Sequence, residues 1–138
     1  MNHRTFTIIK PDSVVNKNVG KIIAHLEGDG FRIVAGRMTH LSVDQARAFY
    51  AVHSERPFYN DLVEYMTSRP VWVMSLEREN AVPHQRKTTG ATHPAEADAG
   101  TIRALYGESI ERNAIHGSDS DENAAIENAF FFSTSELV

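Results

Sequence analysis

The chain has 138 residues and a formal net charge of −4, from 14 Lys and Arg against 18 Asp and Glu. This acidic balance excludes a protein held to nucleic acid or anionic lipid mainly by its overall field, and the absence of cysteine excludes disulfides and thiolate chemistry. The length predicts a single domain over residues 1–138. The longest apolar stretch, near Val71, is far shorter than a membrane span, so we expect a cytoplasmic protein.

The first forty residues follow a strand, helix, strand pattern. Residues 4–10 place apolar side chains among threonines, which predicts a strand ended by Pro11. A helix closed by Gly28-Asp29-Gly30 is predicted next, because apolar residues recur every three or four positions: Val15, Val19, Ile22 and Leu26. Alternation from Phe31 to Met38 predicts a second strand.

Two short helices and a buried strand follow. Ser42 and Gln45 form a capping-box signature at the start of a helix. Arg56-Pro57 interrupts, and residues 62–66 predict a further short helix. The compact apolar run 71–74 predicts a buried strand.

The last third contains a helix after Asn80, with Pro83 tolerable in its first turn. A strand is then predicted to close at Ile115-His116, and residues 118–122 supply the cap and first-turn acids of a terminal helix. This order predicts an α/β (α+β) fold of the ferredoxin-like type, an antiparallel four-stranded sheet with helices covering one face.

One long segment, from Lys87 to Asn113, shows little sustained periodicity. Such a segment inside a compact domain is usually functional or disordered. Its threonines, glycines and arginines suit an anion-binding loop, and a mobile surface loop remains the alternative.

The most informative short segment is Asn113-Ala114-Ile115-His116-Gly117-Ser118-Asp119-Ser120. It places His116 at a strand end, before a glycine that permits an unusual backbone angle or the close approach of a ligand. Glu127, on the terminal helix, could face back towards the imidazole and fix its tautomer, leaving the other ring nitrogen as a nucleophile or a ligand. A packed histidine without a chemical role remains the alternative. Common phosphate-loop, dinucleotide and zinc-protease motifs are absent from the sequence.

Five blocks of sequence together resemble nucleoside diphosphate kinase in its compact bacterial form. The resemblance runs from about Arg4 to Leu137 and rests on the following segments: Thr7-Ile8-Ile9-Lys10-Pro11-Asp12, Glu55-Arg56-Pro57-Phe58, Gly90-Ala91-Thr92, Gly100-Thr101-Ile102-Arg103 and Asn113 to Ser120. It implies that the irregular segment is a nucleotide-binding loop and that residues 1–138 form one kinase domain.

The resemblance implies a phosphotransferase that moves the γ-phosphoryl group of a nucleoside triphosphate to a nucleoside diphosphate. It implies a ping-pong mechanism with a phosphohistidine at His116. Four further catalytic residues are implied: Glu127 and Ser118 would orient the imidazole, and Tyr50 and Lys10 would lie near the phosphates.

Nucleotide contacts are implied at eight positions. Those near phosphate or sugar are Lys10, Arg86, Thr92, Arg103 and Asn113. The base would lie against Phe58, Leu62 and Ile110, and core packing is the alternative role for these apolar residues. Mg²⁺ is expected on the nucleotide phosphates rather than in a protein cage.

The resemblance also implies a homo-oligomer built from dimers, as a tetramer or a hexamer, without a role for membrane or nucleic acid. Five positions depart from the usual family pattern: Arg69, Trp72, Arg78, Leu105 and Asn128. Two other hypotheses remain open, namely a nucleotide-binding regulatory module without turnover and a nucleic-acid-binding protein that uses the same arginines and Phe58.

Overall fold

The computed structural model describes residues 3–138, in which four strands form one sheet in the order β2-β3-β1-β4. Every neighbouring pair is antiparallel. The strands are β1 (Arg4–Ile9), β2 (Arg32–Thr39), β3 (Val71–Glu77) and β4 (Ile115–Gly117). The predicted ferredoxin-like arrangement is confirmed.

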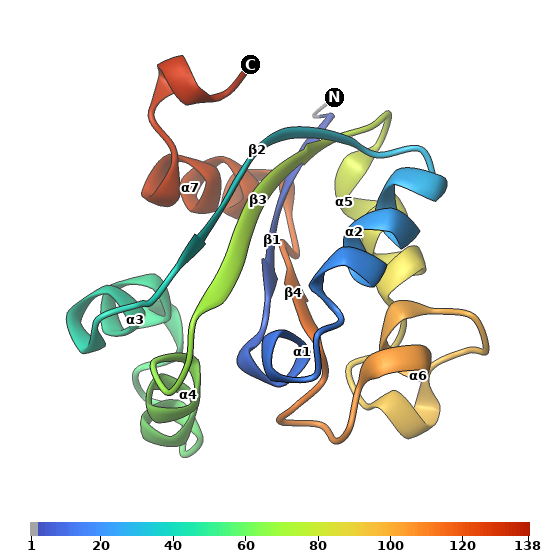
Figure 1. Ribbon diagram of the computed structural model, residues 1–138. Coiled ribbons are helices and arrows are strands. Elements are labelled where there is room, and N and C mark those ends of the chain that lie inside the picture. The colour runs from blue at the N-terminus through green and yellow to red at the C-terminus, as the bar shows by residue number, and fades with distance from the viewer. Residues whose placement is uncertain (1–2) are drawn as a thin grey trace.

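Helices cover both faces of this sheet (Figure 1). They are α1 (Pro11–Val15), α2 (Val19–Gly28), α3 (Val43–Phe49), α4 (Tyr59–Met66), α5 (Ala81–Thr89), α6 (Ile102–Tyr106) and α7 (Asp121–Phe131). The expectation that helices cover one face was wrong. Within residues 3–138, none of the helices has the length and apolar character needed to cross a membrane.

The two layers follow from the alternation of side chains along β1. Phe6 and Ile8 point into a core shared with α3, α4 and α7, whereas Ile9 points into a second core shared with α2 and α5. Successive strand residues face opposite sides of a sheet. A central strand that is buried on both faces therefore needs a helical layer on each side.

Two of the predicted helix starts are confirmed in atomic detail. Ser42 Oγ accepts from Gln45 N at 3.0 Å, and Gln45 Oε1 accepts from Ser42 N at 2.9 Å, which completes the capping box of α3. Ser120 Oγ accepts from Asn123 N at 3.1 Å and caps α7. Both caps satisfy backbone donors that the first helical turn leaves unpaired.

The single helix predicted over residues 15–26 is instead two helices. Lys17 adopts φ +60° between α1 and α2, which breaks the helical path. Val15 consequently ends α1 and is 57% exposed, whereas Ile22 and Leu26 of α2 are fully buried. Apolar spacing could not reveal this break, because Val15 and Val19 are four residues apart in either case.

The segment 87–113 is more regular than predicted. Residues 87–89 complete α5, a 3₁₀ turn covers Pro94–Glu96, and α6 follows. Thr101 caps α6 by accepting from Ala104 N at 3.3 Å. A five-residue helix spans little more than one turn, so its apolar spacing carried too little signal to be recognised.

The unusual Trp72 has a local explanation in its neighbour Gly36. A Cβ added at Gly36 would lie 2.6 Å from Cζ2 of Trp72, so the glycine provides the space that the indole occupies. Arg69 and Arg78 show no positive φ, so neither position requires glycine. Leu105 is 54% exposed on α6, and Asn128 is buried in α7.

Candidate active site

His116 belongs to a three-residue hydrogen-bonded group centred on the Glu127 carboxylate. It is on β4, paired with Ile8 of β1, and its Nε2 lies 3.0 Å from Oε1 of Glu127 on α7. Ser118 Oγ donates to the same carboxylate oxygen at 2.7 Å. With a proton on Nε2 the ring donates to Glu127, and Nδ1 is left as the nitrogen with an available lone pair.

Aromatic rings restrict the movement of this imidazole. The ring centroids of Phe49, Phe6 and Tyr50 lie 5.6, 6.3 and 6.4 Å from that of His116. The Tyr50 hydroxyl is buried and has no hydrogen-bond partner within residues 3–138. Burial and the nearby Glu127 charge raise the pKa of Tyr50 well above its usual value, so the phenol stays protonated.

Gly117 is required by packing rather than by its backbone angle. Its φ is not among the positive values, contrary to the unusual angle considered from the sequence. A Cβ at this position would lie 2.7 Å from Nε2 of Gln85, which is buried on α5. Gln85 accepts a hydrogen bond from Thr5 at 2.7 Å and donates one to Thr7. The bare glycine therefore lets α5 approach β4 beside His116.

Lys10 is a buried cation at the end of β1. Its Nζ donates to Oδ1 of Asn113 at 2.7 Å, and Asn113 Nδ2 donates to the Thr92 carbonyl at 3.0 Å. Burial lowers the pKa of Lys10 to about 8; the charge of Arg103 acts in the same direction and that of Asp12 opposes it. The ammonium is therefore poorly neutralised and would gain from an anionic ligand.

Arg103 of α6 ties three separate segments together. Its guanidinium donates to the carbonyls of Ile115 at 2.8 Å, Gly90 at 3.2 Å and Asn113 at 3.3 Å. Burial lowers its pKa to about 10, with the charge of Arg86 acting in the same direction. Carbonyl dipoles satisfy these donors without neutralising the charge, so this end of the site remains electropositive.

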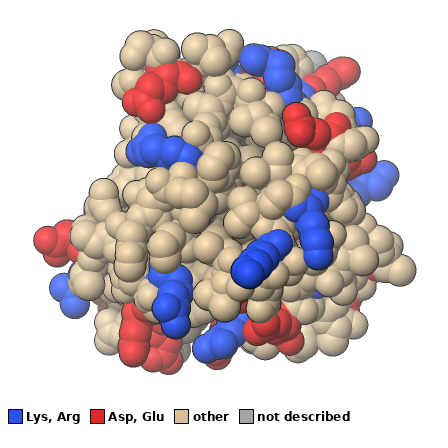
Figure 2. Space-filling model, in the orientation of Figure 1, with Lys and Arg blue, Asp and Glu red and all other residues tan. Residues whose placement is uncertain are grey.

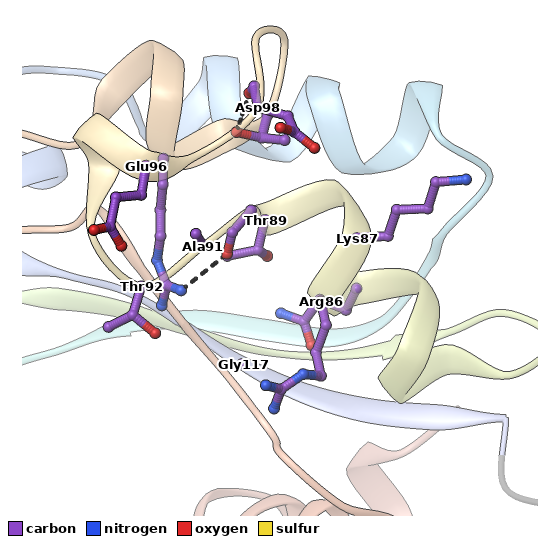
Figure 3. Close-up of a pocket in the computed structure, with 12 residues that line it drawn as sticks. Arg86, Lys87, Thr89, Ala91, Thr92, Glu96, Asp98 and Gly117 are labelled. Carbon is purple, nitrogen blue, oxygen red and sulfur yellow. Dashed lines mark hydrogen bonds between the residues drawn. The ribbon is translucent and has the colours of Figure 1, made fainter.

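A cavity of about 460 Å³ opens beside Arg103, and His116 and Lys10 are not among the residues that line it. Its walls include Arg86, Thr92, Arg103 and Gly117, so three expected phosphate-binding residues meet next to the histidine strand. In Figure 3, Arg86 projects towards Gly117, whereas Lys87 points away from it. The segment after α5 thus lines this cavity with threonine and arginine side chains, and that it binds an anion stays a prediction.

The three residues expected at a base differ in their exposure to solvent. Phe58 at the start of α4 is 49% exposed, and Ile110 in the segment after α6 is 53% exposed. Neither is a core residue. Leu62 packs against the core shared by α3, α4 and α7, so it has the core-packing role that was the alternative to base binding.

Sequence reasoning assigned no role to Asp12, Tyr65 or Gln85. Asp12 is 6% exposed and accepts hydrogen bonds from Ala114 N and from the Tyr65 hydroxyl. Asp12 directly follows Lys10-Pro11 in one of the segments that carry the family resemblance, and this position could have marked it as a site residue. Tyr65 and Gln85 looked like ordinary helix residues, because their partners lie 53 and about 80 positions away.

Charge is spread over the surface rather than gathered into one basic patch on the face shown in Figure 2, where Lys and Arg side chains are interspersed with Asp and Glu. A nucleic-acid-binding surface typically presents a basic patch or stripe. This face therefore does not favour the hypothesis of nucleic-acid binding.

Comparison with known proteins points to one family over the whole chain. A sequence model described as nucleoside diphosphate kinase matches residues 3–137. A nucleoside diphosphate kinase from Campylobacter curvus is 60% identical over 134 residues, which cover 97% of this chain and 98% of that relative. The Aquifex aeolicus enzyme superposes with a TM-score of 0.97 at 42% identity, covering 99% of both chains. The Halobacterium salinarum enzyme, described in complex with CDP, superposes with a TM-score of 0.94 at 38% identity over 100% of this chain and 92% of that one.

The three carbonyl contacts of Arg103 predict a measurable effect on stability. Arg103→Lys keeps the charge but loses the planar fork, so it should lower the free energy of unfolding by about 1–3 kcal/mol. Circular dichroism during chemical unfolding measures this change without any ligand. Arg86→Lys is the matched control, because Arg86 is exposed. Equal stability of the two variants would show that the carbonyl contacts of Arg103 do not hold the site together.

Proposed function

The chain belongs to the nucleoside diphosphate kinase family, whose members transfer a phosphoryl group between nucleotides, and we propose that His116 is the nucleophile of this reaction. The observation that supports the assignment is the contact between His116 Nε2 and Glu127, which Ser118 reinforces. It orients the imidazole and directs Nδ1 away from the carboxylate. We further propose that residues 1–138 act as one kinase domain, since the family match spans 3–137.

The reaction would consist of two half-reactions at one site. In the first, Nδ1 attacks the γ-phosphorus of a nucleoside triphosphate, the bond from that phosphorus to the β–γ bridging oxygen breaks, and a nucleoside diphosphate leaves. In the second, a terminal oxygen of another nucleoside diphosphate attacks the phosphorus and the P–N bond breaks. Glu127 would stabilise the positive charge that develops on the phosphorylated ring.

Dispersed cations would stabilise the transferred phosphate. Phosphoryl transfer spreads negative charge over the outer oxygens of the moving group. Arg86, Arg103 and Thr92 line the cavity beside β4, and the buried Lys10 ammonium lacks a full counter-charge. The buried Tyr50 hydroxyl, unpaired within residues 3–138, would donate near the same phosphate.

The remaining contacts would hold the sugar and the base. Lys10 and Asn113 are already hydrogen-bonded to one another and would share the sugar hydroxyls. The exposed ring of Phe58 would stack on the base, with Leu62 and Ile110 beside it. Stacking tolerates every base. The relative from Halobacterium salinarum is described with CDP, a pyrimidine nucleotide, which supports this open base site.

Mg²⁺ is the proposed cofactor, bound to phosphate oxygens of the nucleotide. In residues 3–138 no group of three or more His, Asp or Glu could hold a metal ion, so the proposal assigns the ion no protein ligand. A hard cation with several retained waters suits phosphate oxygens, and it would neutralise part of their charge.

We also propose a cytoplasmic homo-oligomer built from dimers, as a tetramer or a hexamer. Nucleoside di- and triphosphates, the proposed substrates, are abundant in the cytoplasm. Support for assembly comes from β2, which lies at one edge of the sheet and carries Met38 with 46% exposure. An edge strand with unpaired backbone groups is a ready surface for a second copy.

Sedimentation equilibrium should give a mass several times 15.4 kDa, and the mass of one chain would contradict the proposal.

The phosphohistidine proposal predicts a covalent intermediate. Incubation with ATP and Mg²⁺ should add the mass of one phosphoryl group per chain, and added dGDP should remove it as dGTP forms. His116→Ala should gain no mass and lose transfer activity, because it has no imidazole to attack. His25→Ala, on α2, should behave as wild type. A chain that binds ATP but never gains mass would favour the regulatory-module hypothesis instead.

The lowered pKa of Lys10 predicts a pH dependence. The ammonium is charged below about pH 8 in the free protein, so kcat/KM should fall as the pH rises through 8 and the charge is lost. Lys10→Met should lower kcat/KM by about tenfold or more at pH 7 and remove this fall. Lys21→Met, which changes an exposed lysine on α2, should keep the wild-type profile. Persistence of the same decline in Lys10→Met would show that another group titrates.

A further inference from the structure

A buried carboxylate outside the proposed catalytic group holds an unusual turn. Asp12, on α1, is 6% exposed. Its Oδ2 accepts from Ala114 N at 3.1 Å, and its Oδ1 accepts from the Tyr65 hydroxyl. The Asp12 backbone N–H donates to the same phenol oxygen at 2.9 Å. Tyr65 and Asp12 thus form two hydrogen bonds with each other, and the Asp12 carboxylate also binds the Ala114 amide.

The turn at Ala114 has the geometry of a γ-turn with a positive central angle. Ala114 has φ +76°, and Ile115 N donates to the Asn113 carbonyl at 2.9 Å, two residues back. This form of γ-turn is rare and strained for residues other than glycine. It persists only where neighbouring groups hold it. Lys10 N donates to the Ala114 carbonyl at 2.9 Å, the Asp12 carboxylate accepts from Ala114 N, and Arg103 donates to the carbonyls on either side.

The turn joins two parts of the proposed nucleotide site. Asn113, on one side of it, bonds to the Lys10 ammonium, and Ile115, on the other side, begins the strand that carries His116. Relaxation of Ala114 towards negative φ would change the direction of the chain between these two groups. The Asp12 carboxylate, as one of the groups that hold this turn, therefore helps to set the relative position of the ammonium and the imidazole.

Tyr65 determines how that carboxylate is oriented. It lies on α4, and the guanidinium carbon of Arg112 lies 5.7 Å from the centre of its ring. Burial and the bond to Asp12 raise the pKa of Tyr65 far above its usual value, so the phenol remains a donor. With Oδ1 engaged by Tyr65, Oδ2 points at the Ala114 N–H. A carboxylate without this bond can rotate and leave that buried N–H unpaired.

We propose that Tyr65, acting through Asp12, is a positioning residue that maintains the Asn113–Ala114–Ile115 turn and thereby places His116 and Lys10 for phosphoryl transfer. Tyr65 touches no reacting atom in this scheme. The inference rests on the proposed function of His116, because its kinetic consequence is the rate at which that residue is phosphorylated. Its structural consequence, the protection of the Ala114 amide, does not depend on activity.

Tyr65→Phe is the central test, because it removes only the hydroxyl. In single-turnover reactions with ATP and Mg²⁺, the rate of His116 phosphorylation should fall by about tenfold, since small displacements of reacting groups have effects of this size. The final fraction of phosphorylated chains should stay at the wild-type level. Partial unfolding would instead lower that fraction and leave the rate per folded molecule unchanged.

Tyr59→Phe is the matched control on the same helix. The Tyr59 hydroxyl donates to the Arg47 carbonyl at 3.1 Å, within the α3–α4 region, so its loss should change the phosphorylation rate less than twofold. A rate for Tyr65→Phe within twofold of this control would overturn the inference. If the wild-type protein itself formed no phosphohistidine, the proposed function would fail, and the amide measurement below would still decide whether Tyr65 holds the turn.

Hydrogen exchange gives that second measurement. The Ala114 amide should exchange at least tenfold faster in Tyr65→Phe than in wild type or Tyr59→Phe, because its acceptor is no longer held. Unchanged protection would overturn the structural half of the inference.

A double-mutant cycle tests whether Tyr65 acts through Asp12. Tyr65→Phe should have almost no further effect on the phosphorylation rate in an Asp12→Ala background, whereas independent residues would have effects that multiply. Asp12→Asn should restore part of the rate lost in Asp12→Ala, because an amide oxygen can still accept from Ala114 N. Multiplicative effects would show that Tyr65 acts by another route. Should Asp12→Ala not fold, the rate and exchange measurements on Tyr65→Phe decide the inference without it.

Discussion

The antiparallel pairing of β1 with β4 is the constraint on which the site depends. This ladder aligns Thr7 with Gly117 and Ile9 with Ile115, so that His116 faces Ile8. Because the strands run in opposite directions, the chain leaving β1 meets the chain entering β4 at the same end of the sheet. That end brings Lys10 to Asn113 and closes the bond from Lys10 N to the Ala114 carbonyl. A three-residue strand thus links the position of His116 to that of the Lys10–Asn113 pair.

Two cations with little access to water give this end of the sheet its chemical character. Lys10 is buried and Arg103 is partly buried, and both have lowered pKa values, partly through other cations nearby. Carbonyl oxygens satisfy the donors of Arg103, but dipoles cannot cancel a net charge. Like charges held together in a low dielectric favour any ligand that brings negative charge. These charges therefore support the proposal that the site binds a polyphosphate.

Much of the fold could be read from local patterns, and the failures have specific causes. The capping box at Ser42 and the cap at Ser120 are signals contained within four residues, and both were recognised. The break at Lys17 was missed because a single positive φ leaves no mark on apolar spacing. The second helical layer was missed because threonines alternate with the apolar residues of β1, and only the structure shows that Thr5 and Thr7 are buried as well.

The sequence by itself determined the order of the strands, most of the helices, the family, and the residue types that phosphate chemistry needs, because these are properties of spacing and of side-chain chemistry. It located His116 and Glu127 as a pair, since eleven residues separate them across one turn and one helix. Only the tertiary structure decided that Tyr65 meets Asp12, that Gln85 packs against Gly117, and that Ala114 is held in a left-handed turn. These contacts join residues far apart along the chain, and no local pattern encodes them. They form only when the helices pack against the finished sheet.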